Sequence, residues 1–222
     1  MKKIISAKDA VAMVKDGSSI MVGGFMVCGH PFTLMEELLR KGTKNLILIS
    51  NDAGFPDKGI GKLIVNGQVS HLIASHIGLN PVAGQKMNSG EMKVELVPQG
   101  TLAERIRSKG AGLGGFLTPT GVGTEVEKGK QKMTINGKDY LLELPLGADY
   151  SFIKATIVDK NGNCFIAKSA KNFNVVMAMA GDCVVVEAEK IVEVGELDPD
   201  MVDVPGVFVN YIVPAEINDK GF

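Results

Sequence analysis

The segment DGSSIMVGGFMVCGHP, residues 16–31, decides the fold of this 222-residue chain. Its short apolar run, residues 19–22, is typical of a strand buried in a parallel sheet. Glycines occupy positions 23, 24 and 29, so the chain carries no side chains at these positions as it leaves the strand. Pro31 suits the first turn of a helix because its φ is fixed and it lacks an N–H. The segment therefore predicts a strand, a glycine loop and a helix N-terminus, an arrangement that can bind anionic groups such as phosphates. A tight turn without a ligand would leave the same pattern.

The rest of the chain alternates expected strands with expected helices. Ser6 indicates the N-cap of a first helix, Thr101 opens a capping box for a later one, and Asn136-Gly137 indicates a type I′ hairpin. Further strands are expected at residues 45–50, 71–75, 93–97, 151–159 and 183–187, and helices at 31–40 and 171–180. This order predicts an α/β fold in one domain, residues 1–222. Its mostly parallel sheet is flanked by helices on both faces and interrupted by an inserted β-hairpin.

The composition argues against several classes of function. The 24 basic and 25 acidic residues leave a formal net charge of −1, which gives no reason to expect nucleic acid or an anionic membrane as a partner. Cys28, Cys164 and Cys183 are widely spaced and form no metal-binding motif with the three histidines, so we expect reduced thiols and no metal site. No apolar run approaches the roughly 18 residues that a membrane span needs, and no signal peptide is recognisable. The expected location is the cytoplasm.

Polar residues follow two more of the expected strands. Asn51 and Asp52 come after the strand at 45–50, and Gln99 comes after the strand at 93–97. The carboxyl ends of parallel strands meet at one edge of a sheet, where ligands bind, so these residues are expected to converge with the Gly24 loop. The same residues could instead be turn residues that only hydrogen-bond to backbone groups of their own loops.

These segments resemble the family I coenzyme A transferases. The string at residues 16–31 is similar to the signature at the start of the family's α subunit. Three later strings follow in the family's order: SNDAG at 50–54, VPQGTLAERIR at 97–107 and GAGLGGFLTPTGVGT at 110–124. The resemblance covers most of the chain and is closest to the α subunits of short-chain acetate/butyrate–acetoacetate CoA-transferases. It implies the fold that CoA-transferases share with ribose-phosphate isomerases.

The resemblance also implies a division of the chemistry between two subunits. Family members use a glutamate in a Ser-Glu-Asn-Gly motif to attack acyl-CoA, and this motif does not occur in the chain. The implied protein is an α subunit with no catalytic residue of its own, which needs a β subunit, usually as α2β2, to supply the glutamate. The implied reaction moves CoA between acetoacetyl-CoA, or another short acyl-CoA, and acetate or butyrate by a ping-pong route. Coenzyme A is a substrate here, and no cofactor is expected.

The same resemblance implies which residues form the site. The loop would hold CoA or a developing oxyanion, and the polar residues after the strands would hold the acyl or carboxylate group. Asp52 stands where related transferases carry Asn and, as a carboxylate, can only accept hydrogen bonds. The expected binding residues are Gly24, Phe25, Met26, Val27, Cys28, Gly29, His30, Asn51, Asp52 and Gln99.

Other interpretations stay open at this point. The presence of His30 in the loop is explained about equally well by loop geometry and by phosphate binding. The presence of Cys28 is explained by the need for a small side chain that packs in a tight loop. The same fold also hosts sugar-phosphate isomerases, although no acid–base set can be assigned in this chain. A CoA-binding regulatory module would bind CoA without turnover.

Overall fold

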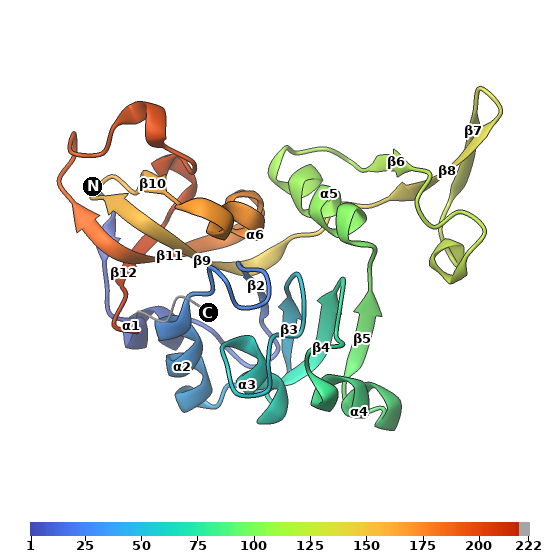
Figure 1. Ribbon diagram of the computed structural model, residues 1–222, viewed down its shortest axis with the longest axis horizontal. Coiled ribbons are helices and arrows are strands. Elements are labelled where there is room, and N and C mark those ends of the chain that lie inside the picture. The colour runs from blue at the N-terminus through green and yellow to red at the C-terminus, as the bar shows by residue number, and fades with distance from the viewer. Residues whose placement is uncertain (218–222) are drawn as a thin grey trace.

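The computed structural model describes residues 1–217 as two β-sheets, with helices packed on the larger one (Figure 1). In these residues the larger sheet has nine strands. Eight of them lie in the order β1-β12-β11-β9-β2-β3-β4-β5 with every neighbouring pair parallel, and β10 pairs antiparallel with β9. The bounds are β1 Lys3–Ile4, β2 Ser19–Val22, β3 Leu46–Ile49, β4 Val69–Ala74, β5 Lys93–Leu96, β9 Ala148–Asp159, β10 Cys164–Phe165, β11 Gly181–Val192 and β12 Tyr211–Pro214.

Helices cover both faces of this sheet, as the sequence predicts. In Figure 1, α1 to α4 lie on one side of the sheet and α5 and α6 on the other. The bounds are α1 Ala7–Ala12, α2 Phe32–Lys41, α3 Ile60–Val65, α4 Pro81–Ser89, α5 Gln99–Gly110 and α6 Lys171–Met177. Short 3₁₀ turns complete the chain: η1 Glu125–Glu127, η2 Lys168–Ala170, η3 Pro199–Met201 and η4 Gly206–Phe208.

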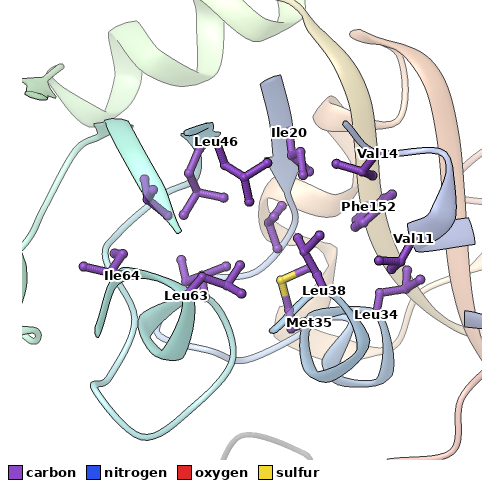
Figure 2. Packing of buried hydrophobic residues seen from close by; sticks show 14 of the residues in the cluster. Val11, Val14, Ile20, Leu34, Met35, Leu38, Leu46, Leu63, Ile64 and Phe152 are labelled. Carbon is purple, nitrogen blue, oxygen red and sulfur yellow. The ribbon is translucent and has the colours of Figure 1, made fainter. Parts of the chain in front are cut away.

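The two helical layers create two hydrophobic clusters. Successive strand residues point to opposite faces, so Ile20 of β2 packs into the cluster with α1 to α3, whereas Met21 packs into the cluster with α5 and α6. Figure 2 shows the first cluster, in which Leu34 and Leu38 of α2 and Leu63 of α3 meet the sheet. Burial on both faces explains why the central strands β2 and β3 read as apolar runs.

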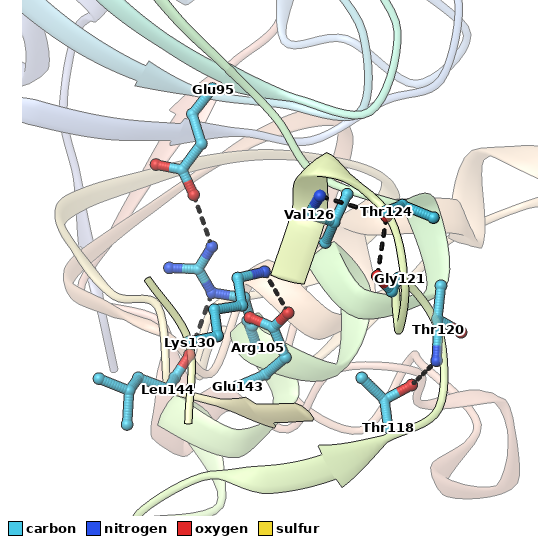
Figure 3. A network of polar contacts seen from close by, with 10 residues as sticks. All are labelled: Glu95, Arg105, Thr118, Thr120, Gly121, Thr124, Val126, Lys130, Glu143 and Leu144. Carbon is cyan, nitrogen blue, oxygen red and sulfur yellow. Dashed lines mark hydrogen bonds and ion pairs between the residues drawn. The ribbon is translucent and has the colours of Figure 1, made fainter. Parts of the chain in front are cut away.

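The second sheet forms an arm that projects from the body beyond α5 (Figure 1). It has the order β6-β8-β7, with β6 Phe116–Thr118, β7 Lys132–Ile135 and β8 Lys138–Glu143. The hairpin prediction is confirmed, because Asn136 and Gly137 both have the positive φ that a type I′ turn needs. Arg105 of α5 ties the arm to the body: its guanidinium pairs with Glu95 (2.8 Å) and donates to the carbonyl of Leu144 (3.0 Å) (Figure 3).

Two local expectations were wrong. The capping box at Thr101 does not form, because α5 already begins at Gln99 and Leu102 donates its N–H to the carbonyl of Pro98 (2.9 Å). The C-terminal part, where Pro199, Pro205 and Pro214 predict extended, irregular structure, contains the regular strand β12, which pairs with β11 and β1 in the main sheet. The strand β12 has only four residues and ends in Pro214, which has no N–H for a sheet ladder, so the local pattern does not mark it as a strand.

Candidate functional site

The glycine loop after β2 closes into a tight turn. The backbone N–H of Phe25 donates to the carbonyl of Cys28 (3.1 Å), and the N–H of Cys28 donates back to Phe25 (2.9 Å). Between them, Met26 and Val27 have φ values of 47° and 65°, in the left-handed region. That conformation is costly for a β-branched valine. Such strain persists only where surrounding contacts impose it, often at functional sites.

Asp52 imposes part of this conformation. It follows β3, is 2% exposed, and accepts hydrogen bonds from the backbone N–H groups of Met26 (2.8 Å) and Gly54 (2.7 Å). The side-chain amide of Asn51 donates to the same carboxylate (2.9 Å). All three neighbours are donors, which suits a group that can only accept. Asp52 therefore ties the loop after β2 to the loop after β3.

Two positions of the loop have room only for glycine, because neighbouring side chains lie too close for a Cβ atom. A Cβ on Gly24, where φ is +123°, would lie 1.9 Å from Cδ2 of His30, and a Cβ on Gly23 would lie 1.9 Å from Oδ1 of Asn174. From α6, the amide of Asn174 also donates to the carbonyl of Gly29 (3.0 Å). The loop is thus packed against His30 on one side and against α6 on another.

His30 is a buried support of the loop. Its side chain lines none of the cavities around the loop, and its Nδ1 has no hydrogen-bond partner within residues 1–217. Burial lowers the pKa of His30 to about 4; the charge of Lys154 acts in the same direction, and the charge of Asp52 opposes it. The imidazole is therefore neutral at physiological pH and packs as an uncharged ring.

A carboxylate of the protein already occupies the N-terminus of α2. Glu187 of β11 is fully buried and accepts a hydrogen bond from the N–H of Leu34 (3.0 Å). Burial raises the pKa of Glu187 to about 7, although hydrogen bonds from Leu34 and Thr33 and the charge of Lys154 oppose the shift. The Glu187 side chain therefore occupies the position at this helix N-terminus where a phosphate was expected, and the phosphate site stays a prediction.

Four neighbouring strands bring their following loops to one cavity of about 370 Å³. The strands are β2, β3, β4 and β5, which lie side by side in this order. The lining residues are Phe25, Met26, Asn51, Asp52, Ser75, His76, Leu79 and Gln99. The cavity lies beyond the carboxyl ends of the strands, where parallel α/β sheets bind ligands. We call it the amide cavity, after Asn51 and Gln99.

The structure separates the ten expected binding residues into three groups. Phe25, Met26, Asn51, Asp52 and Gln99 line the amide cavity. Cys28 and Gly29 line another cavity, together with Lys154 and Ser169, and Gly24, Val27 and His30 line none of these cavities.

Much of the loop backbone is already hydrogen-bonded within the protein. Gly23 donates its N–H to the carbonyl of Phe152 (2.9 Å), Met26 donates to Asp52, and Phe25 and Cys28 donate to each other. These four N–H groups are not available in this conformation to hold CoA or an oxyanion. The N–H groups of Gly24, Val27 and Gly29 donate to no acceptor within residues 1–217, so the loop keeps three backbone donors beside the side chains that line the cavity.

Sequence reasoning missed the contribution of β4. Ser75 and His76 follow this strand as Asn51 follows β3, so the same rule would have found them. The Ser75 hydroxyl donates to the carbonyl of Asn51 (2.7 Å), and the carbonyl of His76 accepts from the N–H of Ala53 (3.1 Å). No feature of the sequence marks Leu79, whose place in the cavity depends on the path of the loop.

The described part of the chain contains no group of His, Cys, Asp and Glu side chains that could hold a metal ion. Its three cysteines are free thiols. None of its helices is long and apolar enough to cross a membrane.

Comparisons with known proteins agree on a family. The family model described as coenzyme A transferase matches residues 4–215. The acetate CoA-transferase subunit alpha of Escherichia coli K12 is 54% identical over 214 residues, which cover 96% of this chain and 97% of that protein. The acetoacetyl-CoA:acetate/butyrate CoA transferase alpha subunit of Clostridium acetobutylicum is 54% identical over 211 residues, which cover 95% and 97%.

A solved structure shows the same fold. The acyl-CoA transferase of E. coli O157:H7, crystallised as a thioester complex with CoA, superposes with a TM-score of 0.86 at 24% identity. The match covers 99% of this chain and 48% of that protein, so the chain spans about half its length. The family model matches nearly the whole sequence, and two relatives are identical at more than half of their aligned positions. This chain therefore belongs to the coenzyme A transferase family.

Proposed function

We propose that this chain is the α subunit of a heteromeric short-chain CoA-transferase. The enzyme moves CoA between acetoacetyl-CoA, or another short acyl-CoA, and acetate or butyrate. One observation carries the proposal: α subunits with these two activities in their names are each 54% identical to the chain and are matched over 97% of their own lengths. Residues 1–222 form one CoA-transferase domain, and the enzyme works in the cytoplasm.

The nucleophile is a glutamate of the β subunit. Its carboxylate attacks the thioester carbonyl of acyl-CoA, and the CoA thiolate leaves, which gives a mixed anhydride. The thiolate then attacks the glutamyl carbonyl, releases the carboxylate product and leaves a glutamyl-CoA thioester. An incoming carboxylate reverses these steps and leaves as the new acyl-CoA. Coenzyme A is a substrate throughout, and the reaction needs no cofactor.

This chain binds and orients the acyl or carboxylate group. Gln99 is exposed at the first turn of α5 and lines the amide cavity, and its side chain makes no hydrogen bond within residues 1–217. Its amide N–H is free to donate to a carboxylate or to a developing oxyanion. The amide of Asn51 donates to Asp52 (2.9 Å), so Asn51 and Asp52 act mainly by fixing the shape of the cavity. Phe25 and Met26 form its apolar wall.

The incomplete site also favours a β subunit. The amide cavity contains amide, imidazole and carboxylate side chains, and its one carboxylate, Asp52, accepts three hydrogen bonds from the protein. Asp52 is thus a poor nucleophile, because its lone pairs are engaged. A second subunit that places its glutamate at the open side of the cavity completes the site, and α2β2 is the assembly we propose.

Two rival functions have less support. A sugar-phosphate isomerase on the same fold needs a free acid–base pair, and the amide cavity offers only His76 beside the engaged Asp52. A CoA-binding regulatory module would bind CoA without turnover. The full-length similarity to enzyme subunits favours the transferase over both.

Acetoacetyl-CoA consumption with acetate or butyrate tests the proposal. The assay is run on this chain alone and on this chain co-purified with the β subunit encoded beside it. Activity only in the complex supports an α subunit whose nucleophile lies on the partner. Activity of the chain alone contradicts this division of labour. Binding of CoA without turnover in the complex favours the regulatory module, and turnover of a phosphosugar by the chain alone favours the isomerase.

A further inference from the structure

The segment that leads into α6 contacts the glycine-loop turn at three points (Figure 1). The side-chain amide of Asn172 donates to the carbonyl of Cys28 (3.1 Å), and the amide of Asn174 donates to the carbonyl of Gly29 (3.0 Å). The hydroxyl of Ser169 lies 3.4 Å from the Cys28 thiol. Two consecutive carbonyls of the loop are therefore held by side chains that come 144 and 145 residues later in the chain.

The helix α6 is interrupted at Asn172. Its φ of −19° and ψ of −115° are not helical, although the residues on both sides of it belong to the helix. Its amide nitrogen also donates to the carbonyl of Ser169 (2.7 Å), and its side-chain oxygen accepts the N–H of Phe173 (2.6 Å). The Asn172 side chain thus has two roles: its oxygen caps the start of the helix, and its nitrogen joins that helix to the loop.

The bond from Asn172 fixes the orientation of one peptide group. The Cys28 carbonyl also accepts from the N–H of Phe25 (3.1 Å), so both of its lone pairs are engaged. In a planar trans peptide the N–H points opposite to the carbonyl, so the N–H of Gly29 takes its direction from these two bonds. That N–H donates to no acceptor within residues 1–217, and Gly29 lines a cavity. Asn172 therefore sets the direction of one free donor of the loop.

Backbone strain occurs on both sides of this contact. Within residues 1–217, five residues other than glycine have positive φ, and two of them are asparagines, which adopt this conformation more readily than most residues do. The other three are Met26 and Val27 in the turn and Lys168 at the start of η2. Such strain persists only where surrounding contacts impose it, and it is common at functional sites. The turn and the segment that holds it are therefore kept in one arrangement by their contacts.

We propose that Asn172 is a positioning residue of the transferase. Through the Cys28 carbonyl it keeps the turn, and with it the free N–H of Gly29, in the arrangement that acyl transfer requires, without touching the reacting groups itself. With Asp52, which accepts from the N–H of Met26, it holds the turn at both ends. This inference rests on the proposed function, because it concerns the site of that enzyme.

A purely local role for Asn172 predicts a different result from one substitution. Aspartate has nearly the same shape, and its carboxylate still accepts the N–H of Phe173, so Asn172→Asp preserves the cap of the helix. It has no N–H to donate, and it places a carboxylate against the carbonyls of Cys28 and Ser169, which repels the turn. Of the two roles of the side chain, only the donor role is lost.

Two measurements on the complex with the β subunit test the proposal. In Asn172→Asp we expect kcat and kcat/KM for CoA transfer from acetoacetyl-CoA to acetate to fall together, by about tenfold, because a displaced donor stabilises the developing charge less well. Amide hydrogen exchange in residues 24–29, measured by mass spectrometry, should become about tenfold faster, because the turn opens more easily. Asn172→Ala removes the same donor, should give the same two results, and carries the test if Asn172→Asp does not fold.

Asn163→Ala is the matched control. The Asn163 amide likewise both donates and accepts, to the carboxylate of Asp159 (2.8 Å) and from the N–H of Gly206 (2.8 Å). It lies in the turn between β9 and β10 and lines none of the cavities around the glycine loop. The control should keep the wild-type kcat/KM and the wild-type exchange of residues 24–29, whatever its effect on the urea midpoint of unfolding.

Each outcome decides for or against the positioning role. A wild-type kcat/KM in Asn172→Asp overturns it, and so does a fall in activity without faster exchange of the loop, because Asn172 would then act on the substrate directly. Equal losses in Asn163→Ala overturn it as a general effect of lost stability. If the wild-type complex transfers no CoA, the proposed function fails instead. The exchange measurement then still tests whether Asn172 holds the turn, and unchanged exchange in the variant contradicts it.

Discussion

The backbone N–H of Met26 donates a 2.8 Å hydrogen bond to the carboxylate of Asp52, which lies 26 residues later in the chain. The bond joins the loops after two adjacent parallel strands, and it acts on a residue whose φ of 47° is unfavourable. Asp52 is buried and accepts two more hydrogen bonds from neighbouring donors. The shape of the amide cavity therefore depends on one carboxylate that need not touch a substrate.

Replacement of Asp52 by Ala should destabilise the protein and lower activity together. The change leaves three donors without their acceptor in a buried position, on Met26, Gly54 and Asn51. We expect a loss of roughly 3–5 kcal/mol in the free energy of unfolding, measured by urea denaturation, because each hydrogen bond to a charged group contributes about 1.5–3 kcal/mol. Asp52→Asn is the matched control and should lose less, since one oxygen still accepts. Equal losses in the two variants would contradict the role of the carboxylate.

Replacement of Gln99 by Ala should affect activity but not stability. The side chain is exposed and makes no hydrogen bond in the described structure, so the free energy of unfolding should stay within about 0.5 kcal/mol of wild type. We expect kcat/KM for acyl transfer in the complex with the β subunit to fall roughly 10- to 100-fold, the effect of a lost hydrogen bond to a charged group. Arg107→Ala, on an exposed part of the same helix, is the control. Unchanged turnover in Gln99→Ala would remove Gln99 from the site.

Gly24→Ala should reveal how closely the loop packs on His30. A Cβ at position 24 would lie 1.9 Å from the imidazole, whereas a Cβ at Gly17, which also has positive φ, would meet nothing within 4 Å. Gly17→Ala therefore measures the backbone cost alone, about 1 kcal/mol. Gly24→Ala should cost about 2 kcal/mol more, because the ring must move.

A second substitution separates the clash from other causes. In Gly24→Ala with His30→Ala, the ring is absent, so the two changes together should destabilise by less than the sum of their separate effects. Urea denaturation of the four proteins in this cycle measures the difference. Strict additivity would show that His30 does not limit the space at Gly24.

The sequence was sufficient to predict the elements that depend on local pattern. The apolar runs placed β2 and β3, and Asn136-Gly137 placed the turn of the arm, because these signals involve neighbouring residues. The edge of the sheet that holds the amide cavity also followed from topology, since parallel strands carry their following loops to one side.

Contacts between distant segments could not be predicted in this way. Glu187 lies 153 residues after Leu34, and no spacing rule connects a glutamate in an apolar strand with the start of a remote helix. Similarly, Asn174 reaches the glycine loop only because α6 packs against β2 and β9.

The burial of Glu187 should make stability depend on pH in an unusual direction. Burial raises the pKa of Glu187 from the usual 4.5 to about 7, so the folded state keeps a proton that the unfolded chain loses. The stability that this group contributes is complete below pH 4.5 and is lost as the pH rises through 7, in total about 3 kcal/mol. His30 acts in the opposite sense, since its pKa is lowered to about 4 and its contribution is lost as the pH falls from 6.5.

Glu187→Gln isolates the effect of the buried carboxylate. Glutamine is neutral at every pH, and its carbonyl oxygen can still accept the N–H of Leu34. The His30 contribution is common to both proteins and cancels in their difference. We expect the free energy of unfolding of Glu187→Gln minus that of wild type, measured in urea, to rise by about 2–3 kcal/mol between pH 5 and pH 8. A difference that does not change with pH would mean that Glu187 is ionised throughout this range, and that the donors at the α2 N-terminus, with Lys154 nearby, outweigh the cost of its burial.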